Sequence, residues 1–279
     1  MNILKTTLLL TVLTCLFLFI GYSFGGEGGM TAAFFFAALM NIGAYWFSDK
    51  LILTMMGAKE LPKEEAPQIH AIVERLALKA SMPMPKVYLS PQQAPNAFAT
   101  GRSPRHAAVC VTEGVMRLLN EEELEGVLAH ELSHVRHRDT LISSVAATLA
   151  GAIMMLARWA QWAALFSSRD GERRKGGGLE LLFMAIVAPF AAMLIQLAVS
   201  RSREFSADRG GALLCEKPLA LADALRKLEA SPKGLLTAAP QNAHLFIVNP
   251  FKREGFLSLF RTHPATAERI RRLEMIARG

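Results

Sequence analysis

Long apolar runs constrain the fold of this chain more strongly than any other feature of its sequence. Two of them, at about 6–24 and 30–53, lie near the N-terminus, and two more lie at about 141–166 and 179–200. Each is close to the roughly 20 residues that cross a bilayer as an α-helix. A helix satisfies all of its backbone polar groups internally, which is what a membrane interior requires. We therefore expect an integral membrane protein with about four apolar helices.

The composition supports this interpretation. Hydrophobic residues make up 52% of the 279 residues, and the mean hydropathy of +0.26 is high for a soluble domain. The formal net charge is +7, and Lys and Arg flank the apolar runs with few aromatic residues among them. This pattern favours a lipid bilayer as partner and no nucleic acid. Cys15, Cys110 and Cys215 form no Cys-x-x-Cys, which favours buried thiols over disulfides or a thiolate metal site.

The distribution of charge predicts an orientation in the membrane. The link between the first two runs carries Glu27 and no Lys or Arg, whereas the second run ends beside Lys50. By the positive-inside rule the link lies outside and the chain after Lys50 lies inside. A signal peptide cleaved near 23–26 is the alternative for the first run. The basic loop 167–178 leaves open whether 141–200 spans the membrane or forms a re-entrant hairpin.

The stretches between and after the apolar runs have the composition of a water-facing domain. Asn120 is a good N-cap, and the three glutamates that follow it suit the positive end of a helix. Helical spacing of apolar residues and short apolar segments between Pro and Gly indicate the other elements. The expected helices cover about 69–80, 218–229 and 265–277, and the expected strands cover 86–90, 97–100 and 107–112.

These elements predict a mainly α fold of the α+β type, in which a small β-sheet lies beside the helix that follows Asn120. The expected organisation has four segments, two in the membrane and two that together form one water-facing domain. They are two transmembrane helices in 1–53, the first part of the domain in 54–140, an apolar helical hairpin in 141–200 and the second part of the domain in 201–279.

The helix after Asn120 contains the sequence His-Glu-Leu-Ser-His from His130 to His134. Residues four apart lie on one face of a helix, so both imidazoles can converge on one metal ion. Glu131 is rotated by about 100° from His130, which suits a base rather than a ligand. Two solvated histidines are the alternative, but the well-capped helix favours the metal site. His137 lies about 10 Å along the axis from His130, too far to share the ion.

A catalytic zinc ion needs a third protein ligand. Glu204 and Asp208 lie one helical turn apart in a downstream segment. Glu204 would complete a site of two histidines and one glutamate, and Asp208 would hold an imidazole N–H. The alternative is a pair of surface acids among arginines. The two intervening apolar runs return the chain to the side it left, so the site can assemble near the membrane surface.

These residues resemble the HtpX-type membrane zinc metalloproteases, which are relatives of the CAAX prenyl proteases. The match rests on His130–His134 together with Glu204 and Asp208, and it extends over nearly the whole chain. The further matching segments are 95–101, 244–250, 262–264 and 269–270.

The resemblance implies a zincin-like metalloprotease domain in a multi-pass protein of the bacterial inner membrane, with the active site facing the cytoplasm. Its substrates would be polypeptides, above all misfolded or damaged membrane proteins. His130, His134 and Glu204 would bind one Zn²⁺ per chain. Glu131 would be the general base for the attacking water.

The resemblance also implies that Asn96 and His263 lie beside the scissile peptide. In the expected mechanism, Asn96 or His263 donates to the developing oxyanion. A turn asparagine and a histidine at a helix start are the alternatives. The segment 96–100 is expected to receive substrate as an added β-strand. A CAAX-type prenyl-protein processing protease and a catalytically silent membrane scaffold are the rival functions, and no oligomeric state is predicted.

Overall fold

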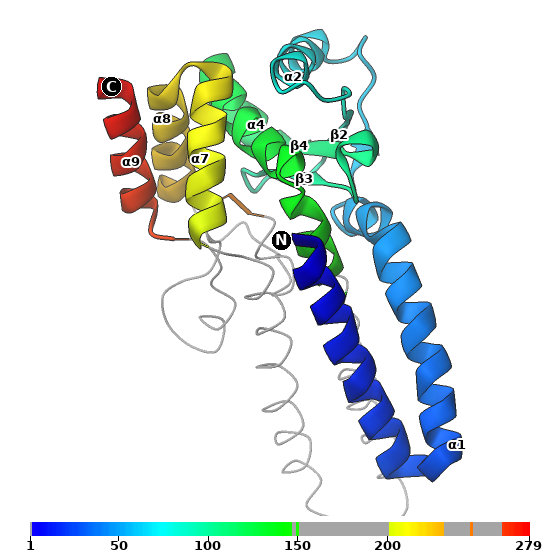
Figure 1. Ribbon diagram of the computed structural model, residues 1–279. Coiled ribbons are helices and arrows are strands. Elements are labelled where there is room, and N and C mark those ends of the chain that lie inside the picture. Colours follow the sequence, from blue (N-terminus) through cyan, green and yellow to red (C-terminus); the bar gives the residue numbers. More distant parts are fainter. Residues whose placement is uncertain (1, 147–148, 151–200, 232–245, 248–263) are drawn as a thin grey trace, which may run out of the picture.

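The computed structural model describes residues 2–146, 149–150, 201–231, 246–247 and 264–279. Figure 1 shows a long helical hairpin and, at its upper end, a domain of helices around a small sheet. The mostly helical architecture with a small sheet confirms this part of the expected fold. Most of the third apolar run, all of the fourth, and His263 lie outside the described residues.

The N-terminal helix α1 (Asn2–Met55) is folded back on itself. It is kinked at Gly25 and Gly26, and Gly26 has a φ of +56°. The two arms run antiparallel (Figure 1), and a Cβ on Gly29 would lie 2.2 Å from the carbonyl oxygen of Gly21. Only glycine permits so close an approach of two backbones. The arms correspond to the first two expected apolar helices.

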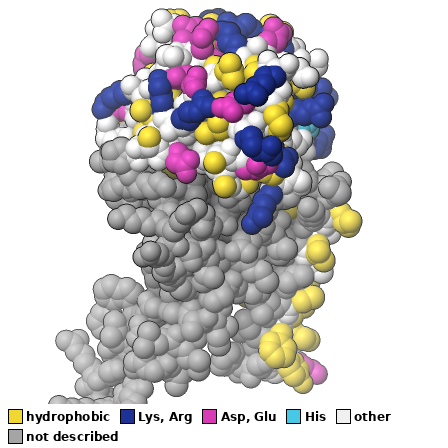
Figure 2. Space-filling model, turned by 90° about the vertical axis from the view of Figure 1, so that its left-hand side faces the viewer, with side chains coloured by type: hydrophobic (Ala, Val, Ile, Leu, Met, Phe, Trp, Pro, Cys, Tyr) yellow, Lys and Arg dark blue, Asp and Glu magenta, His cyan; other side chains and the backbone are white. Residues whose placement is uncertain are grey.

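One segment among the described residues, Gly25–Met55, is long and apolar enough to cross a membrane. The expectation of about four such helices is therefore not confirmed as a whole. Figure 2 shows hydrophobic side chains along the visible part of α1. On the same face, Lys and Arg are interspersed with Asp and Glu over the domain.

The sheet has four strands in the order β1-β2-β4-β3. β2 and β4 are parallel and the other two pairs are antiparallel, which leaves β3 at one edge. Three strands confirm the expected ones, and the first was missed because two residues show no alternation. The bounds are β1 (Lys59–Glu60), β2 (Lys86–Ser90), β3 (Ala97–Thr100) and β4 (Ala108–Thr112).

The helices of the domain follow the local signals of the sequence. At the start of α4, Asn120 Oδ1 accepts from the N–H of Glu123, and the Glu123 carboxylate accepts from the N–H of Asn120. This capping box satisfies two donors that the helix end would leave unpaired. The bounds are α2 (Pro67–Lys79), α3 (Glu113–Leu118), α4 (Glu121–Arg136), α7 (Arg201–Cys215), α8 (Pro218–Ala230) and α9 (Thr266–Arg278).

Helix α4 forms the centre of the domain, and glycines let its neighbours approach it closely. A Cβ on Gly211 of α7 would lie 2.7 Å from the backbone nitrogen of His130. A Cβ on Gly126 of α4 would lie 3.0 Å from the backbone nitrogen of Leu221 of α8. α7 and α8 therefore lie almost backbone to backbone against α4. This packing places the acidic residues of α7 opposite the histidines of α4.

Candidate metal centre

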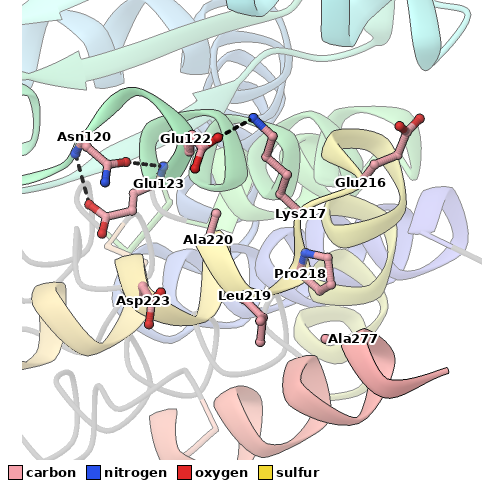
Figure 3. Close-up of a pocket in the computed structure, with 10 residues that line it drawn as sticks. All are labelled: Asn120, Glu122, Glu123, Glu216, Lys217, Pro218, Leu219, Ala220, Asp223 and Ala277. Atoms are coloured by element: carbon pink, nitrogen blue, oxygen red, sulfur yellow. Dashed lines mark hydrogen bonds and ion pairs between the residues drawn. The ribbon is translucent and has the colours of Figure 1, made fainter.

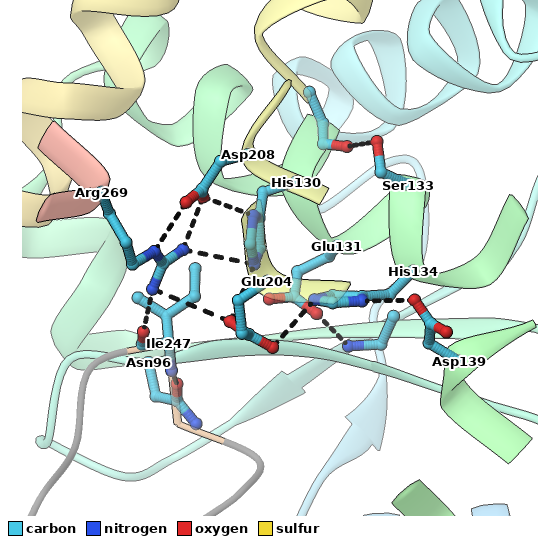
Figure 4. Close-up of polar contacts among 12 residues, drawn as sticks. Asn96, His130, Glu131, Ser133, His134, Asp139, Glu204, Asp208, Ile247 and Arg269 are labelled. Atoms are coloured by element: carbon cyan, nitrogen blue, oxygen red, sulfur yellow. Dashed lines mark hydrogen bonds and ion pairs between the residues drawn. The ribbon is translucent and has the colours of Figure 1, made fainter. Parts of the chain in front are cut away.

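Three side chains from two helices converge inside the domain (Figure 4). His130 and His134 lie on α4, and Glu204 lies in the first turn of α7. One potential ligand atom of each lies within 4.8 Å of the other two. The Glu204 carboxylate is 3.9 Å from Nε2 of His130 and 3.5 Å from Nε2 of His134. The structure thus brings together the three residues that the sequence indicated as metal ligands.

The donor set fits a zinc ion. Two imidazoles and one carboxylate are the ligands of one type of catalytic zinc site, which keeps a further position open. His130 and Glu204 are only 1% and 4% exposed. A buried carboxylate between two imidazoles, whose Nε2 atoms lie 3.9 and 3.5 Å away, is a donor set that favours a bound cation.

Each imidazole also faces a carboxylate on its other side. Nδ1 of His130 lies 3.0 Å from Asp208 Oδ1, and Nδ1 of His134 lies 3.1 Å from Asp139 Oδ2. Such outer partners fix the ring and its tautomer, and they leave Nε2 for the metal. Asp208 was expected near an imidazole, whereas Asp139 was missed. It lies beyond the end of α4, so helical spacing does not point to it.

Burial and nearby charges shift the pKa values of these groups. Burial lowers the pKa of His130. Burial acts in the same direction on His134, but the hydrogen bond with Asp139 and the charge of Glu204 raise its pKa to about 9. Burial raises the pKa of Glu131 to about 7. A carboxyl group that titrates near neutrality is suited to accept and return a proton.

Glu131 projects from α4 towards the edge strand β3. Its Oε2 accepts a hydrogen bond of 2.9 Å from the N–H of Ala99, which therefore points away from β4. Asn96, immediately before β3, is 1% exposed, and its Oδ1 accepts from the N–H of Ile247 at 3.3 Å. The candidate base and Asn96 are thus both anchored at the same sheet edge (Figure 4).

A buried arginine borders the cluster, and the sequence analysis gave it no role. Arg269 of α9 donates from Nε and Nη2 to the two oxygens of Asp208, at 2.8 and 2.7 Å. Its Nη1 donates to the carbonyl oxygen of Ile247 at 2.7 Å. Although burial raises the pKa of Asp208, the charge and hydrogen bonds of Arg269 hold it well below its usual range. The sequence analysis placed Arg269 in a matching segment, 269–270, but did not indicate what the side chain does.

The remaining candidates, His137 and His263, lie apart from the cluster or outside the residues that the structure describes. His137 is exposed at the C-cap of α4 and is not one of the three clustered residues, as its spacing predicts. His263 lies outside the described residues.

A separate pocket of about 470 Å³ lies at the N-terminal end of α4 (Figure 3). None of the three clustered residues, His130, His134 and Glu204, lines this pocket. Within it, the Lys217 ammonium forms an ion pair of 2.9 Å with the Glu122 carboxylate. The chemistry that we assign to this chain therefore belongs to the cluster and not to this pocket.

Comparison with known proteins agrees with the geometry. Residues 63–277 match peptidase family M48. Proteins named Protease HtpX homolog from Persephonella marina, Syntrophotalea carbinolica and Pyrococcus furiosus are 53%, 54% and 52% identical to this chain. The alignments cover 100%, 98% and 98% of this chain, and 98%, 98% and 95% of those proteins.

A solved structure extends the comparison to the fold. The crystal structure of S. mikatae Ste24p superposes with a TM-score of 0.52 at 18% identity. The match covers 93% of this chain but 61% of that longer one. Because the family match spans most of the sequence and relatives above 50% identity span nearly all of it, the chain belongs to peptidase family M48.

Proposed function

We propose that this M48 peptidase hydrolyses peptide bonds of membrane proteins with a single zinc ion held by His130, His134 and Glu204. The observation that carries the proposal is the buried convergence of these side chains, with ligand atoms within 4.8 Å of one another. When bound, zinc supplies Lewis acidity that polarises a carbonyl group and lowers the pKa of a water molecule.

Glu131 acts as the general base. It takes a proton from the attacking water and passes it to the leaving amine. Three features support this role: its position beside His130 on α4, its burial, and its orientation towards β3. Its hydrogen bond with the N–H of Ala99 keeps the carboxylate at the strand where a substrate would lie.

Asn96 or His263 donates a hydrogen bond to the developing oxyanion, and the edge of β3 receives the substrate as an added strand. For Asn96 the support is its burial at the start of β3 and the contact with Ile247 that fixes its side chain. The Oδ1 atom of Asn96 accepts from the N–H of Ile247. The other end of the amide, Nδ2, carries the two hydrogens that can be donated to an oxyanion.

The chain is a multi-pass protein of a bacterial inner membrane with its active site on the cytoplasmic side, and its substrates are misfolded or damaged membrane proteins. The apolar segment Gly25–Met55 of α1 supports the membrane location, and the protease names of the relatives support polypeptide substrates. Segments 54–140 and 201–279 form one peptidase unit, which the close packing of α7 on α4 supports. Segments 1–53 and 141–200 form the membrane part.

The decisive experiment measures zinc-dependent proteolysis. Metal-free full-length protein, purified in detergent, is given zinc and an unfolded substrate such as casein, with Glu131→Ala treated identically. We expect one zinc ion per chain in both proteins and cleavage only by the parent. A parent that binds no zinc contradicts the proposed site, and equal cleavage by both proteins contradicts the role of Glu131. Strong preference for a C-terminally prenylated peptide would instead indicate a processing protease.

A further inference from the structure

An arginine is buried directly beside a site that would hold a divalent cation. Arg269 is 1% exposed. Its Nη1 lies 3.9 Å from the Glu204 carboxylate, and its Nη2 lies 3.4 Å from Nε2 of His130. A fixed positive charge at this distance opposes the binding of a metal ion. Arg269 must therefore contribute something that offsets this repulsion, and its hydrogen bonds with Asp208 and Ile247 indicate what that is.

The guanidinium holds Asp208 with two parallel hydrogen bonds. Nε and Nη2 donate to the two carboxylate oxygens at 2.8 and 2.7 Å, and Asp208 is only 2% exposed. This two-pronged pairing fixes both the position and the rotation of a carboxylate, which a single donor does not do. Without the arginine, Asp208 would be a buried charge without its cationic partner and free to reorient.

Asp208 in turn orients the first metal-binding histidine. Its Oδ1 lies 3.0 Å from Nδ1 of His130, and a carboxylate at this distance favours the tautomer with the proton on Nδ1 and the lone pair on Nε2. Nη2 of Arg269 faces the same Nε2, where only an acceptor fits. Both neighbours thus select the tautomer that binds a metal ion through Nε2.

A third contact keeps the guanidinium in place. Nη1 donates to the carbonyl oxygen of Ile247 at 2.7 Å, and the N–H of Ile247 donates to Asn96. The arginine is thereby anchored to α7 and to the segment beside Asn96, while its own backbone belongs to α9 (Figure 4).

We propose that Arg269 is a positioning residue of the metal site, which locks Asp208 so that Asp208 holds His130 in the orientation and tautomer that bind the metal ion. The inference rests on the proposed function, since it requires that the metal ion binds at His130. Arg269 acts through Asp208 and not on the substrate.

The test measures zinc affinity rather than proteolysis. Full-length proteins in detergent compete with a chromogenic chelator for zinc, and helix content by circular dichroism shows that each variant is folded. Arg269→Met is expected to weaken zinc binding about 10–100-fold, the usual effect of losing an outer partner of a ligand. Arg269→Lys is expected to weaken it less, because it keeps the charge without the two-pronged geometry. Arg271→Met is the matched control. It removes an exposed arginine of the same helix whose ion pair is with Glu268 of that helix.

A double-substitution cycle tests whether the effect passes through Asp208. In an Asp208→Asn background, Arg269→Met is expected to cause little further loss of zinc affinity. Additive losses, or affinity equal to that of the parent in folded Arg269→Met, would overturn the proposal. If Arg269→Met does not fold, Arg269→Lys decides, and its parent-like affinity overturns the proposal. A parent that binds no zinc refutes the proposed function itself, whereas zinc binding by the parent and Arg269→Met alike refutes only this inference.

Discussion

At the residue scale, two carboxylates decide how the histidines can act. Asp208 and Asp139 each lie close to Nδ1 of one ring, at 3.0 and 3.1 Å. Both rings therefore present Nε2 towards the third acidic residue, Glu204. The fourth acidic group of the site, Glu131, differs from these three because its carboxylate accepts a hydrogen bond from the N–H of Ala99 on β3.

Glu204→Gln tests the third ligand. The substitution keeps the shape of the side chain but removes the negative charge between the two histidines. Outer partners of ligands are worth about 10–100-fold in metal affinity, so loss of a ligand is expected to exceed roughly 100-fold. Chelator competition measures the affinity, and His137→Ala is the control because that exposed residue lies outside the cluster. Parent-like zinc affinity in Glu204→Gln would show that another group completes the site.

Asn96→Asp separates the two ends of the Asn96 side chain. The variant keeps an acceptor for the N–H of Ile247 but loses the amide hydrogens that we assign to the oxyanion. Turnover of zinc-loaded protein is expected to fall on the order of 100-fold, the effect of losing one oxyanion donor. Zinc content, measured in parallel, is expected to stay at one ion per chain. Full turnover in the variant would remove Asn96 from the mechanism.

The sequence predicts the metal ligands of this site better than it predicts the residues that hold those ligands in place. The spacing of His130 and His134 follows from helix geometry alone, and so does that of Glu204 and Asp208. Arg269 is different, because its importance comes from which of several arginines α9 turns inward. Its spacing from Thr266 and Leu273 puts Arg269 on the buried face of α9, but that spacing does not say which side chain it meets there.

At the element scale, the site exists because α7 and α4 approach each other closely at Gly211. The helix signals of the sequence, such as the capping box at Asn120, predict where α4 begins. They do not predict which face of α7 lies against it, because that depends on the packing of a distant segment. Short elements escape prediction for a simpler reason, as β1 shows: two residues have no periodicity.

Gly211→Ala is expected to disturb the metal site through this helix contact. Alanine normally stabilises a helix interior by about 1 kcal/mol relative to glycine. Here its Cβ would lie 2.7 Å from the backbone nitrogen of His130, and overpacking of this kind costs about 1–3 kcal/mol. We expect a lower melting temperature and weaker zinc binding. The control is Gly210→Ala, whose Cβ would meet the side chain of Ser133, at 2.7 Å from Oγ and 3.2 Å from Cβ, and not the backbone of a metal ligand. Equal effects of the two substitutions would contradict the argument.

At the scale of the whole molecule, the hairpin determines which side of the membrane holds the site. An antiparallel hairpin returns the chain to the side from which it started, and Figure 1 places the N-terminus beside the domain. The kink at Gly25 and Gly26 forms the distant tip, next to Glu27. If α1 crosses the bilayer, the tip and the domain face opposite compartments, and the positive-inside rule puts the domain in the cytoplasm.

Cysteine labelling in spheroplasts tests this orientation. Cys15 is exposed and is first replaced by Ala, whereas Cys110 and Cys215 are buried and stay. In this background, Gly28→Cys places a thiol at the exposed tip, and Leu78→Cys places one on α2, where the native side chain is 74% exposed. A membrane-impermeant maleimide is expected to label the tip in intact spheroplasts and the α2 position only after lysis.

Each other labelling pattern has a distinct meaning. The reverse pattern would place the peptidase domain outside, where the cytoplasmic assignment fails although the metal chemistry stands. Labelling of both positions without lysis would mean that the hairpin does not cross the membrane. In that case the exposed apolar side chains of α1, which Figure 2 shows below the charged domain, would need another partner to cover them. The proposed orientation of the active site can thus fail independently of its chemistry.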